Sequence, residues 1–312
     1  MKIGISTCLL GQQVRYDGGH KHDRYLTDIL GKYVTYVPVC PETESGLPVP
    51  REAMRLVGEI ENPKLVTIKT GIDQTKRLQD WSSSKIHDLK NENLCGFIFK
   101  SKSPSSGMER VKVYNDKGHP VPKGRGIFAG MFMDRLPLIP VEEDGRLNDA
   151  KLRENFIARI FVFSRWRELM EKELTVGRLV DFHTKHKLLI MSHNEKAYRE
   201  MGRMIAHAKE YDLNELTDEY ADKLMAALKL ISTTKKNVNV LQHVMGYFKK
   251  QLSSDEKQEL LEIINNYSQS LLPLIVPVTL INHYVRKYDQ GYLKEQVYLN
   301  PHPMELKLRN HV

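Results

Sequence analysis

The stretch GFIFKSKSPSSG, residues 96–107, runs from an apolar segment into a loop of serines, lysines and one proline. A short apolar run that is followed by turn residues predicts a buried β-strand. Similar runs occur at KIGIST, YVTYVPV, LVTIKT and RVKVY, and amphipathic or turn-rich segments separate them. This alternation predicts an α/β N-terminal domain with a mostly parallel sheet, covering residues 1–140.

The second half of the chain has a different pattern. Its long segments space their apolar residues as a helix does: NFIARIFVFSRWRELM, Val176 to His193, AYREMGRMIAHAKEY, DEYADKLMAALKLI, VNVLQHVMGYFKK and DEKQELLEIINNYSQSL. They predict an all-α C-terminal domain over residues 150–312. The stretch PLIPVEEDGRLND, residues 137–149, is predicted to connect the two domains.

Composition limits the class of protein. The 312 residues carry a formal net charge of +8, which favours a polyanionic partner such as RNA. No apolar run approaches the roughly 18 residues that a membrane helix needs, and the first residues lack the pattern of a secretory signal. We therefore expect a cytoplasmic protein without a membrane partner, and the sequence indicates no obligate protein partner.

Two of the three cysteines stand at strand ends. Cys8 follows KIGIST and Cys40 follows YVTYVPV, whereas Cys95 precedes its strand. Because ligands of open α/β sheets bind outside the carboxyl ends of the strands, Cys8, Cys40 and the serine loop are predicted to converge. Cys95 is predicted at the opposite end of the sheet.

Local chemistry leaves four interpretations of this convergence open. In the first interpretation, both cysteines are buried and pack as small apolar residues. In the second, one of them is a nucleophile, and His20 and His22 are the only histidines close in sequence that could act as its base. A phosphate cradle fits the serines and lysines, but the GxxxxGK[ST] pattern is missing. A soft-metal or iron–sulfur site fits thiolates from separate strands, although two cysteines are fewer than such a cluster normally requires.

Three blocks resemble the signatures of the thiouracil desulfidase family: CLLGQQVRYDGGHK (8–21), PVCPETESGLPVPREAMRL (38–56) and FKSKSPSSGMERVKVY (99–114). Four further blocks resemble the helical domain that is fused to it in bacterial tRNA 4-thiouridine desulfidases. They are residues 179–203, 237–253, 273–288 and 298–303. Together the blocks cover nearly the whole chain.

The resemblance implies an enzyme that removes sulfur from 4-thiouridine in tRNA and leaves uridine. In the family, three cysteines hold a [4Fe-4S] cluster whose remaining iron binds the thiocarbonyl sulfur. Carried over by motif, Cys8 and Cys40 match two cluster ligands and Glu42 matches the acid/base. Ser103 matches a serine that orients the substrate or water.

Ser106 departs from the family pattern, which usually has cysteine at this position. Either the serine ligates iron as a harder oxygen donor, or the cluster is weakened or absent. Cys95 is a poor substitute because it belongs to the other end of the sheet. The alternative function is a non-catalytic protein that binds RNA or a thiolated base.

Other candidate residues are assigned by charge and position. The turn with Arg15, Tyr16 and Asp17 is a candidate substrate contact, as is Arg51. Candidate RNA contacts in the helical domain are Arg178, Lys185, Lys187, Lys235, Lys236, Lys249 and Lys250. His183 and His186 have a spacing compatible with a metal, but we expect them in the core or facing phosphate.

Overall fold

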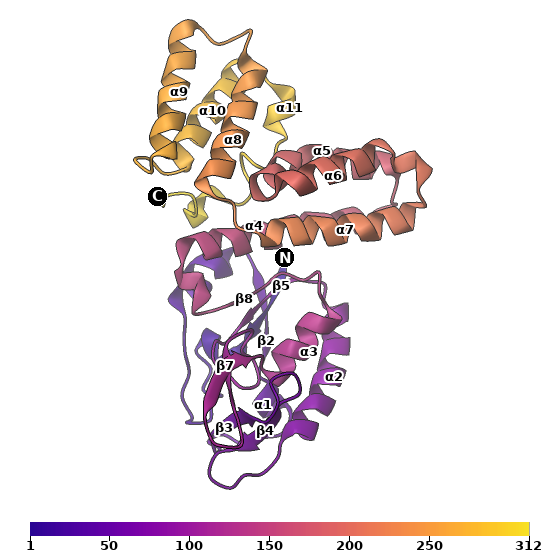
Figure 1. Ribbon diagram of the computed structural model, residues 1–312, viewed down its shortest axis with the longest axis vertical. Coiled ribbons are helices and arrows are strands. Elements are labelled where there is room, and N and C mark those ends of the chain that lie inside the picture. Colours follow the sequence, from indigo (N-terminus) through magenta and orange to yellow (C-terminus); the bar gives the residue numbers. More distant parts are fainter. Residues whose placement is uncertain (312) are drawn as a thin grey trace. The chain divides into compact units, whose positions relative to one another are not determined.

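The computed structural model describes residues 1–311, and the chain forms two compact units, residues 1–149 and 150–312 (Figure 1). The first unit contains both β-sheets, and the second is helical. The predicted order of an α/β domain followed by an all-α domain is therefore confirmed. The first unit extends past residue 140 because the segment predicted as a connector contains a strand, β8 (Val141–Glu143).

One sheet of the first unit is entirely parallel, with the strand order β2-β1-β5-β8. Its other strands are β1 (Lys2–Ser6), β2 (Thr35–Val39) and β5 (Leu94–Phe99). The predicted strands YVTYVPV, KIGIST and GFIFKS are the first three members of this order, with YVTYVPV at the edge. All of β5 is buried, which explains its uninterrupted apolar sequence.

The remaining predicted strands belong to a second, mixed sheet of order β4-β3-β6-β7. Its strands are β3 (Met54–Val57), β4 (Lys64–Thr67), β6 (Val111–Tyr114) and β7 (Pro120–Gly124). The sequence did not reveal β3 or β7. The segment PVPKG of β7 has two prolines, which are tolerated at a sheet edge but weaken the signal of a strand.

Three helices belong to the first unit: α1 (Pro41–Glu44), α2 (Thr75–Asn91) and α3 (Ile127–Arg135). Helices α2 and α3 lie side by side in Figure 1. The aromatic core joins α3 to the parallel sheet, because Phe97 and Phe99 of β5 contact Phe128 and Phe132 of α3. This packing fixes α3 next to the segment that leaves β5.

The second unit is built from eight α-helices within the described residues. They are α4 (Ala150–Met170), α5 (Val176–His193), α6 (Glu195–Ala206), α7 (Leu213–Lys229), α8 (Thr234–Met245), α9 (Ser254–Ser268), α10 (Ile275–Lys287) and α11 (Gly291–Lys294). Side chains of Thr175, Asn194, Asp212, Thr233 and Ser253 accept backbone hydrogen bonds at the starts of α5 to α9. These N-caps explain where the helices begin.

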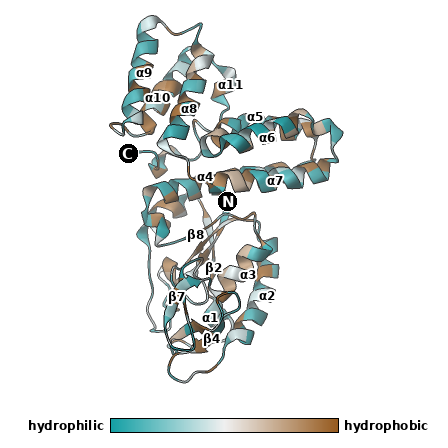
Figure 2. Ribbon diagram, viewed as in Figure 1, coloured by the Kyte–Doolittle hydropathy of each residue, from teal (hydrophilic) through white to brown (hydrophobic). Residues whose placement is uncertain are grey.

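The helices of the second unit bury one face each, and Figure 2 shows hydrophilic and hydrophobic stretches on the same helices. Trp166 of α4, Phe182 of α5 and Tyr220 of α7 contact one another in the core. Between residues 1 and 311 no helix has the length and apolar character to cross a membrane.

Candidate active site

The carboxyl ends of β2, β1 and β5 are neighbours, because the strands are adjacent and parallel. Cys8 lies in a short 3₁₀ helix (Thr7–Leu10) directly after β1, and Cys40 caps α1 directly after β2. The amide of Lys100 donates to Ser6 Oγ over 2.9 Å and so ties the end of β5 to the end of β1. Three segments far apart in sequence thus begin their loops together.

These loops enclose a cavity of about 420 Å³ within the first unit. Most of the site residues predicted in the first domain line it: Cys8, Arg15, Tyr16, Cys40, Glu42, Arg51, Ser103 and Ser106. The predicted convergence of two cysteines and the serine loop is therefore what the fold produces. Cys95 is buried at the start of β5 and does not line the cavity.

The serine loop is held by the first residues of α3. The amide of Ile127 donates to the carbonyl of Pro104, and the amide of Phe128 donates to that of Ser105. Gly126 makes this approach possible, because a Cβ there would lie 2.5 Å from the carbonyl carbon of Ser105. The rim of the cavity next to Ser103 and Ser106 is consequently anchored to the aromatic core.

Glu42 sits in the first turn of α1 and has a different partner on each carboxylate oxygen. Its Oε1 accepts a hydrogen bond of 2.5 Å from Ser105 Oγ. Its Oε2 lies 3.5 Å from Cys40 Sγ and 3.8 Å from Arg51 Nη2. The carboxylate therefore faces the thiol and the cavity while a hydroxyl and a guanidinium hold its orientation.

Ser105 connects Glu42 to Ser103. Because the Ser105 hydroxyl donates to the carboxylate, its oxygen accepts from Ser103 Oγ, which lies 2.9 Å away. Ser103 Oγ in turn accepts from the amides of Ser105 and Ser106. The two residues predicted as catalytic are thus linked through a third, fully buried serine that the sequence reasoning missed. The position of Ser105 inside the SPSSG motif was the feature of the sequence that could have identified it as a site residue.

Burial controls the chemistry of the two thiols. It raises the pKa of Cys8 to about 11, and the nearby Glu42 carboxylate acts in the same direction. Burial followed by Glu42 also raises the pKa of Cys40. The raised pKa values favour the neutral thiol at both positions, and a metal that binds them must displace their protons.

The cavity offers an iron–sulfur cluster two suitable sulfur donors, Cys8 and Cys40. At the third ligand position it offers the hydroxyl oxygen of Ser106. Cys8, Cys40 and Ser106 all line the same space, and Ser106 is 4% exposed. No group of three or more His, Cys, Asp or Glu side chains suited to a metal occurs among the described residues. The set Cys8, Cys40 and Ser106 would hold a cluster only with the serine oxygen as a ligand, which is harder than thiolate.

The four candidate substrate contacts have different surroundings. The Arg51 side chain is 7% exposed, and its Nη1 donates to the carbonyls of Val14 and Pro48. Tyr16 is 44% exposed at the cavity, with the Arg15 guanidinium carbon 5.4 Å from the centre of its ring. Asp17 does not line the cavity but pairs with Arg15 over 3.4 Å. Tyr16 is thus the candidate placed to stack on a base, while Asp17 positions Arg15.

Cations that the sequence reasoning did not single out also line the cavity: Lys21, Lys100 and Lys102. Lys100 pairs with Asp144 over 2.8 Å, and both side chains are half-buried. The sequence analysis did not predict this pair, because Asp144 follows β8 in the segment that was predicted to be a connector.

The candidate RNA contacts of the second unit fall into two groups. Lys185 pairs with Asp181 and Glu295, Lys187 lies over the ring of Tyr292, and Arg178 donates to the carbonyl of Glu173. Lys236 donates to the carbonyls of His193 and Ile231 over 2.6 and 3.1 Å. By contrast, Lys235, Lys249 and Lys250 are exposed.

The histidines of α5 are core residues. His183 bonds to the Tyr220 hydroxyl over 3.1 Å, and the ring of His186 stacks on Phe182 at 3.9 Å. Burial lowers the pKa of His183 to about 4 and that of His186 to about 3. They form no metal site with a third described ligand.

Comparisons with known proteins separate the same two regions. Residues 3–144 match the family model described as 2-thiouracil desulfurase, and residues 187–303 match a protein family of unknown function, DUF1722. The chain is 30% identical over 165 residues to the uncharacterized protein YbgA of Escherichia coli (strain K12). That match covers 53% of this chain and 98% of YbgA.

A solved structure is also similar, that of the [4Fe-4S]-dependent thiouracil desulfidase TudS. The identity is 28% and the TM-score 0.39, and the match covers 47% of this chain and 93% of TudS.

Proposed function

The chain belongs to the family of Escherichia coli YbgA, and from the site in its first unit we propose that it is a desulfidase that converts 4-thiouridine in tRNA to uridine. The match of residues 3–144 to the 2-thiouracil desulfurase model supports a desulfidase-type function. One observation carries the proposal: two thiols, a carboxylate and the serine loop share a single cavity of about 420 Å³.

The reaction exchanges sulfur for oxygen without a net change of oxidation state. Water forms the new C–O bond, the C–S bond breaks, and the sulfur leaves with the protons of water as hydrogen sulfide. When bound, a [4Fe-4S] cluster supplies an open iron that withdraws electrons from the thiocarbonyl. Cys8, Cys40 and Ser106 would hold it.

Glu42 moves the proton. Its Oε2 faces the cavity, so it accepts a proton from the attacking water and returns it to the departing sulfur. Ser105 and Arg51 hold the carboxylate in place for both steps. Ser103, at the cavity wall, orients the water or the base.

Tyr16 contacts the thiolated base of the tRNA, and the exposed lysines of the second unit contact its phosphate backbone. Tyr16, exposed at the cavity, provides a stacking surface for the thiolated base. Lys235, Lys249 and Lys250 are exposed, which suits contacts with tRNA phosphates.

Anaerobic reconstitution with iron and sulfide, followed by incubation with tRNA that contains 4-thiouridine, tests the function. We expect nucleoside analysis to show uridine in place of 4-thiouridine. Glu42→Gln should abolish the conversion, whereas Glu92→Gln, at an exposed ion pair with Lys2, should not. Unchanged 4-thiouridine in the presence of a fully loaded cluster would contradict the proposal.

The second candidate function is binding of RNA or a thiolated base without catalysis, and the oxygen donor of Ser106 favours it. Ser106→Cys supplies a third thiol to the same cavity, and Ser84→Cys on the exposed face of α2 is its matched control. Iron uptake and activity in the Ser106→Cys variant alone would assign this chain to the binding class. Uptake and activity in the unaltered chain would assign it to the enzymes.

A further inference from the structure

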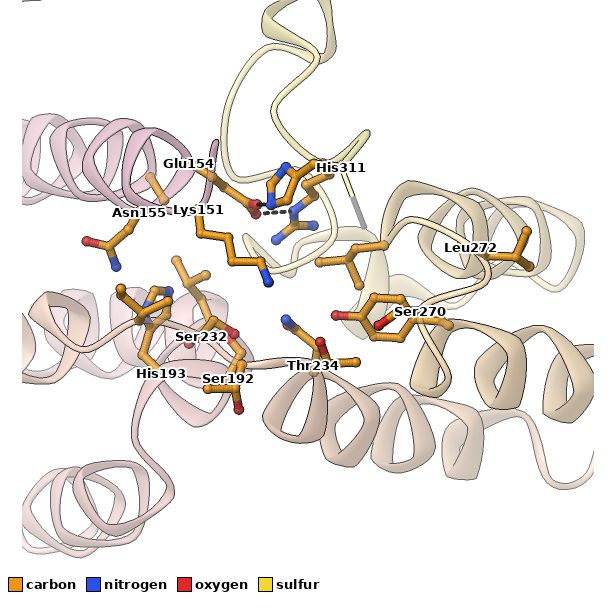
Figure 3. A pocket seen from close by; sticks show the side chains of 18 residues that line it. Lys151, Glu154, Asn155, Ser192, His193, Ser232, Thr234, Ser270, Leu272 and His311 are labelled. Carbon is orange, nitrogen blue, oxygen red and sulfur yellow. Dashed lines mark hydrogen bonds and ion pairs between the residues drawn. The ribbon is translucent and has the colours of Figure 1, made fainter. Parts of the chain in front are cut away.

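Two places in the second unit gather polar side chains from several helices. The first is a cavity of about 190 Å³ beside the start of α4. Its carboxylate, Glu154, is already engaged by Arg309 over 3.2 Å and by His311 over 3.6 Å, and Figure 3 shows Glu154 next to His311. The second place is an exposed group of aromatic rings with lysines around it.

This group, the tyrosine platform, consists of Tyr247, Tyr292, His243 and Lys187. Tyr247 lies in the 3₁₀ turn Gly246–Phe248 after α8, and Tyr292 lies in α11. Their rings are stacked, with centroids 5.0 Å apart and 22° between the ring planes. The ring of His243, one turn earlier in α8, lies 5.7 Å from that of Tyr247 at 77°. These contacts hold the Tyr247 ring in one orientation before any ligand arrives.

The platform is open to solvent at Tyr247, which is 37% exposed. A glycine precedes each tyrosine, Gly246 before Tyr247 and Gly291 before Tyr292. Neither glycine has a left-handed φ, and an added Cβ would meet nothing within 4 Å at either position. Because neither backbone conformation nor close packing requires these glycines, their effect is to leave bare surface beside both rings.

Cations surround the rings. Lys187 Nζ lies 4.9 Å from the centre of the Tyr292 ring, a contact that does not neutralise its charge. Lys249 and Lys250 are exposed and follow Tyr247 by two and three positions. Among the described residues none of these three lysines forms an ion pair. The platform therefore combines a flat aromatic surface with unneutralised positive charge.

We propose that the tyrosine platform stacks an unpaired base of the tRNA. Every base has a π-face that an exposed aromatic ring can bind, and the nearby lysines attract the flanking phosphates. Because the Tyr247 ring is already held in place, little conformational freedom is lost on binding. Glu295, which follows α11, pairs with Lys185 over 3.2 Å, so its charge is offset. The choice of tRNA rests on the proposed function, to which the platform adds a base contact in the second unit.

Binding of an unmodified tRNA transcript to the full chain without a cluster tests the proposal apart from catalysis. We expect Tyr247→Ala to weaken binding by about tenfold, as for the loss of one stacked base, whereas Tyr247→Phe should bind like the unaltered chain. The salt dependence of Tyr247→Ala should not change, because no phosphate contact is lost. Tyr211→Ala is the matched control, because Tyr211 is 50% exposed in the same unit and makes no ring contact with another described residue.

Tyr247→Trp reports on the ligand directly. A base that stacks on an indole quenches its fluorescence, so tRNA should lower the emission of this variant more than that of Tyr211→Trp. Circular dichroism verifies that the helices of each variant remain folded. An oligonucleotide with abasic sites should compete with tRNA less well than one that keeps its bases.

Three results would overturn the proposal. They are equal affinity of Tyr247→Ala and the unaltered chain, equal competition by the abasic oligonucleotide, and a Tyr247→Phe variant as weak as Tyr247→Ala, which would assign the contact to the hydroxyl. None of these assays needs a cluster. A chain that passes them but leaves 4-thiouridine unchanged when loaded would contradict the proposed function and keep the platform.

Discussion

The hydroxyl of Ser105 lies 2.5 Å from Oε1 of Glu42, although the two residues are 63 positions apart in the sequence. The contact joins the loop after β5 to the short helix after β2. It is possible only because the parallel strands deliver both segments to the same edge of the sheet. Through it, the Glu42 carboxylate and the Ser103 hydroxyl belong to one hydrogen-bonded group.

Ser105→Ala should reduce kcat of the desulfidase reaction by about tenfold or more without changing KM. The substitution leaves Glu42 without the donor that holds Oε1, and general acid–base catalysis contributes typically 10²–10⁴-fold. Steady-state rates with a thiolated base measure the effect, and Ser84→Ala on α2 is the control. An unchanged kcat would show that Ser105 only fills the core.

Gly126→Ala should lower both cluster retention and activity. The new Cβ would lie 2.5 Å from the carbonyl carbon of Ser105 and 2.7 Å from the amide nitrogen of Ser106, so the serine loop must move. Iron analysis and turnover measure the result. Gly202→Ala in α6 is the control, because nothing lies within 4 Å of its added Cβ. Full activity of Gly126→Ala would contradict the anchoring role of α3.

Cys95→Ser should leave iron uptake unchanged, whereas Cys8→Ser and Cys40→Ser should abolish it. Only Cys8 and Cys40 line the cavity, and Cys95 is buried at the far end of β5. Iron content after reconstitution distinguishes the three variants. Loss of iron in Cys95→Ser, with a thermal unfolding curve like that of the unaltered chain, would mean that Cys95 reaches the cluster.

The second unit should lose stability as the pH falls from about 6.5 towards 4. Burial lowers the pKa of His183 to about 4 and that of His186 to about 3, from the usual histidine value of about 6.5. Below pH 6.5 the unfolded chain therefore binds more protons than the folded chain, and the free energy of unfolding decreases.

Urea unfolding at several pH values measures this dependence through Trp166. The Trp81→Phe background leaves Trp166 as the single tryptophan of the chain. His186→Leu should reduce the slope of stability against pH in this range, because one proton-binding group is removed. An unchanged slope would show that His186 is protonated in the folded state.

Charge reversal at Lys249 and Lys250 should weaken tRNA binding and reduce its salt dependence. Both residues are exposed, and each lost phosphate contact lowers the salt slope by roughly 0.7–0.9. Binding at several salt concentrations measures the effect, with free thiouracil turnover as the control. Lys236→Glu should instead lower the unfolding temperature, because Lys236 bonds to the carbonyls of His193 and Ile231. Unaltered salt dependence in the double variant would place the tRNA elsewhere.

Local patterns in the sequence determined the order of elements and the set of candidate site residues. The apolar runs that end at Cys8 and before SPSSG are β-strands with side chains buried on both faces. The run that ends at Cys40 is the edge strand β2, whose residues are partly exposed. Parallel strands then require the three loops to share one edge, so the convergence of the thiols with the serine loop was predictable.

Only the tertiary structure decided which atoms meet. The mixed sheet with β3 and β7, the bond between Ser105 and Glu42, and the pairing of Lys100 with Asp144 join residues distant in sequence. Lys235 and Lys236 are neighbours in the chain, yet one is exposed and the other holds two carbonyls. Such differences depend on the packing of whole elements, whereas a sequence pattern reports only the local preference of each segment.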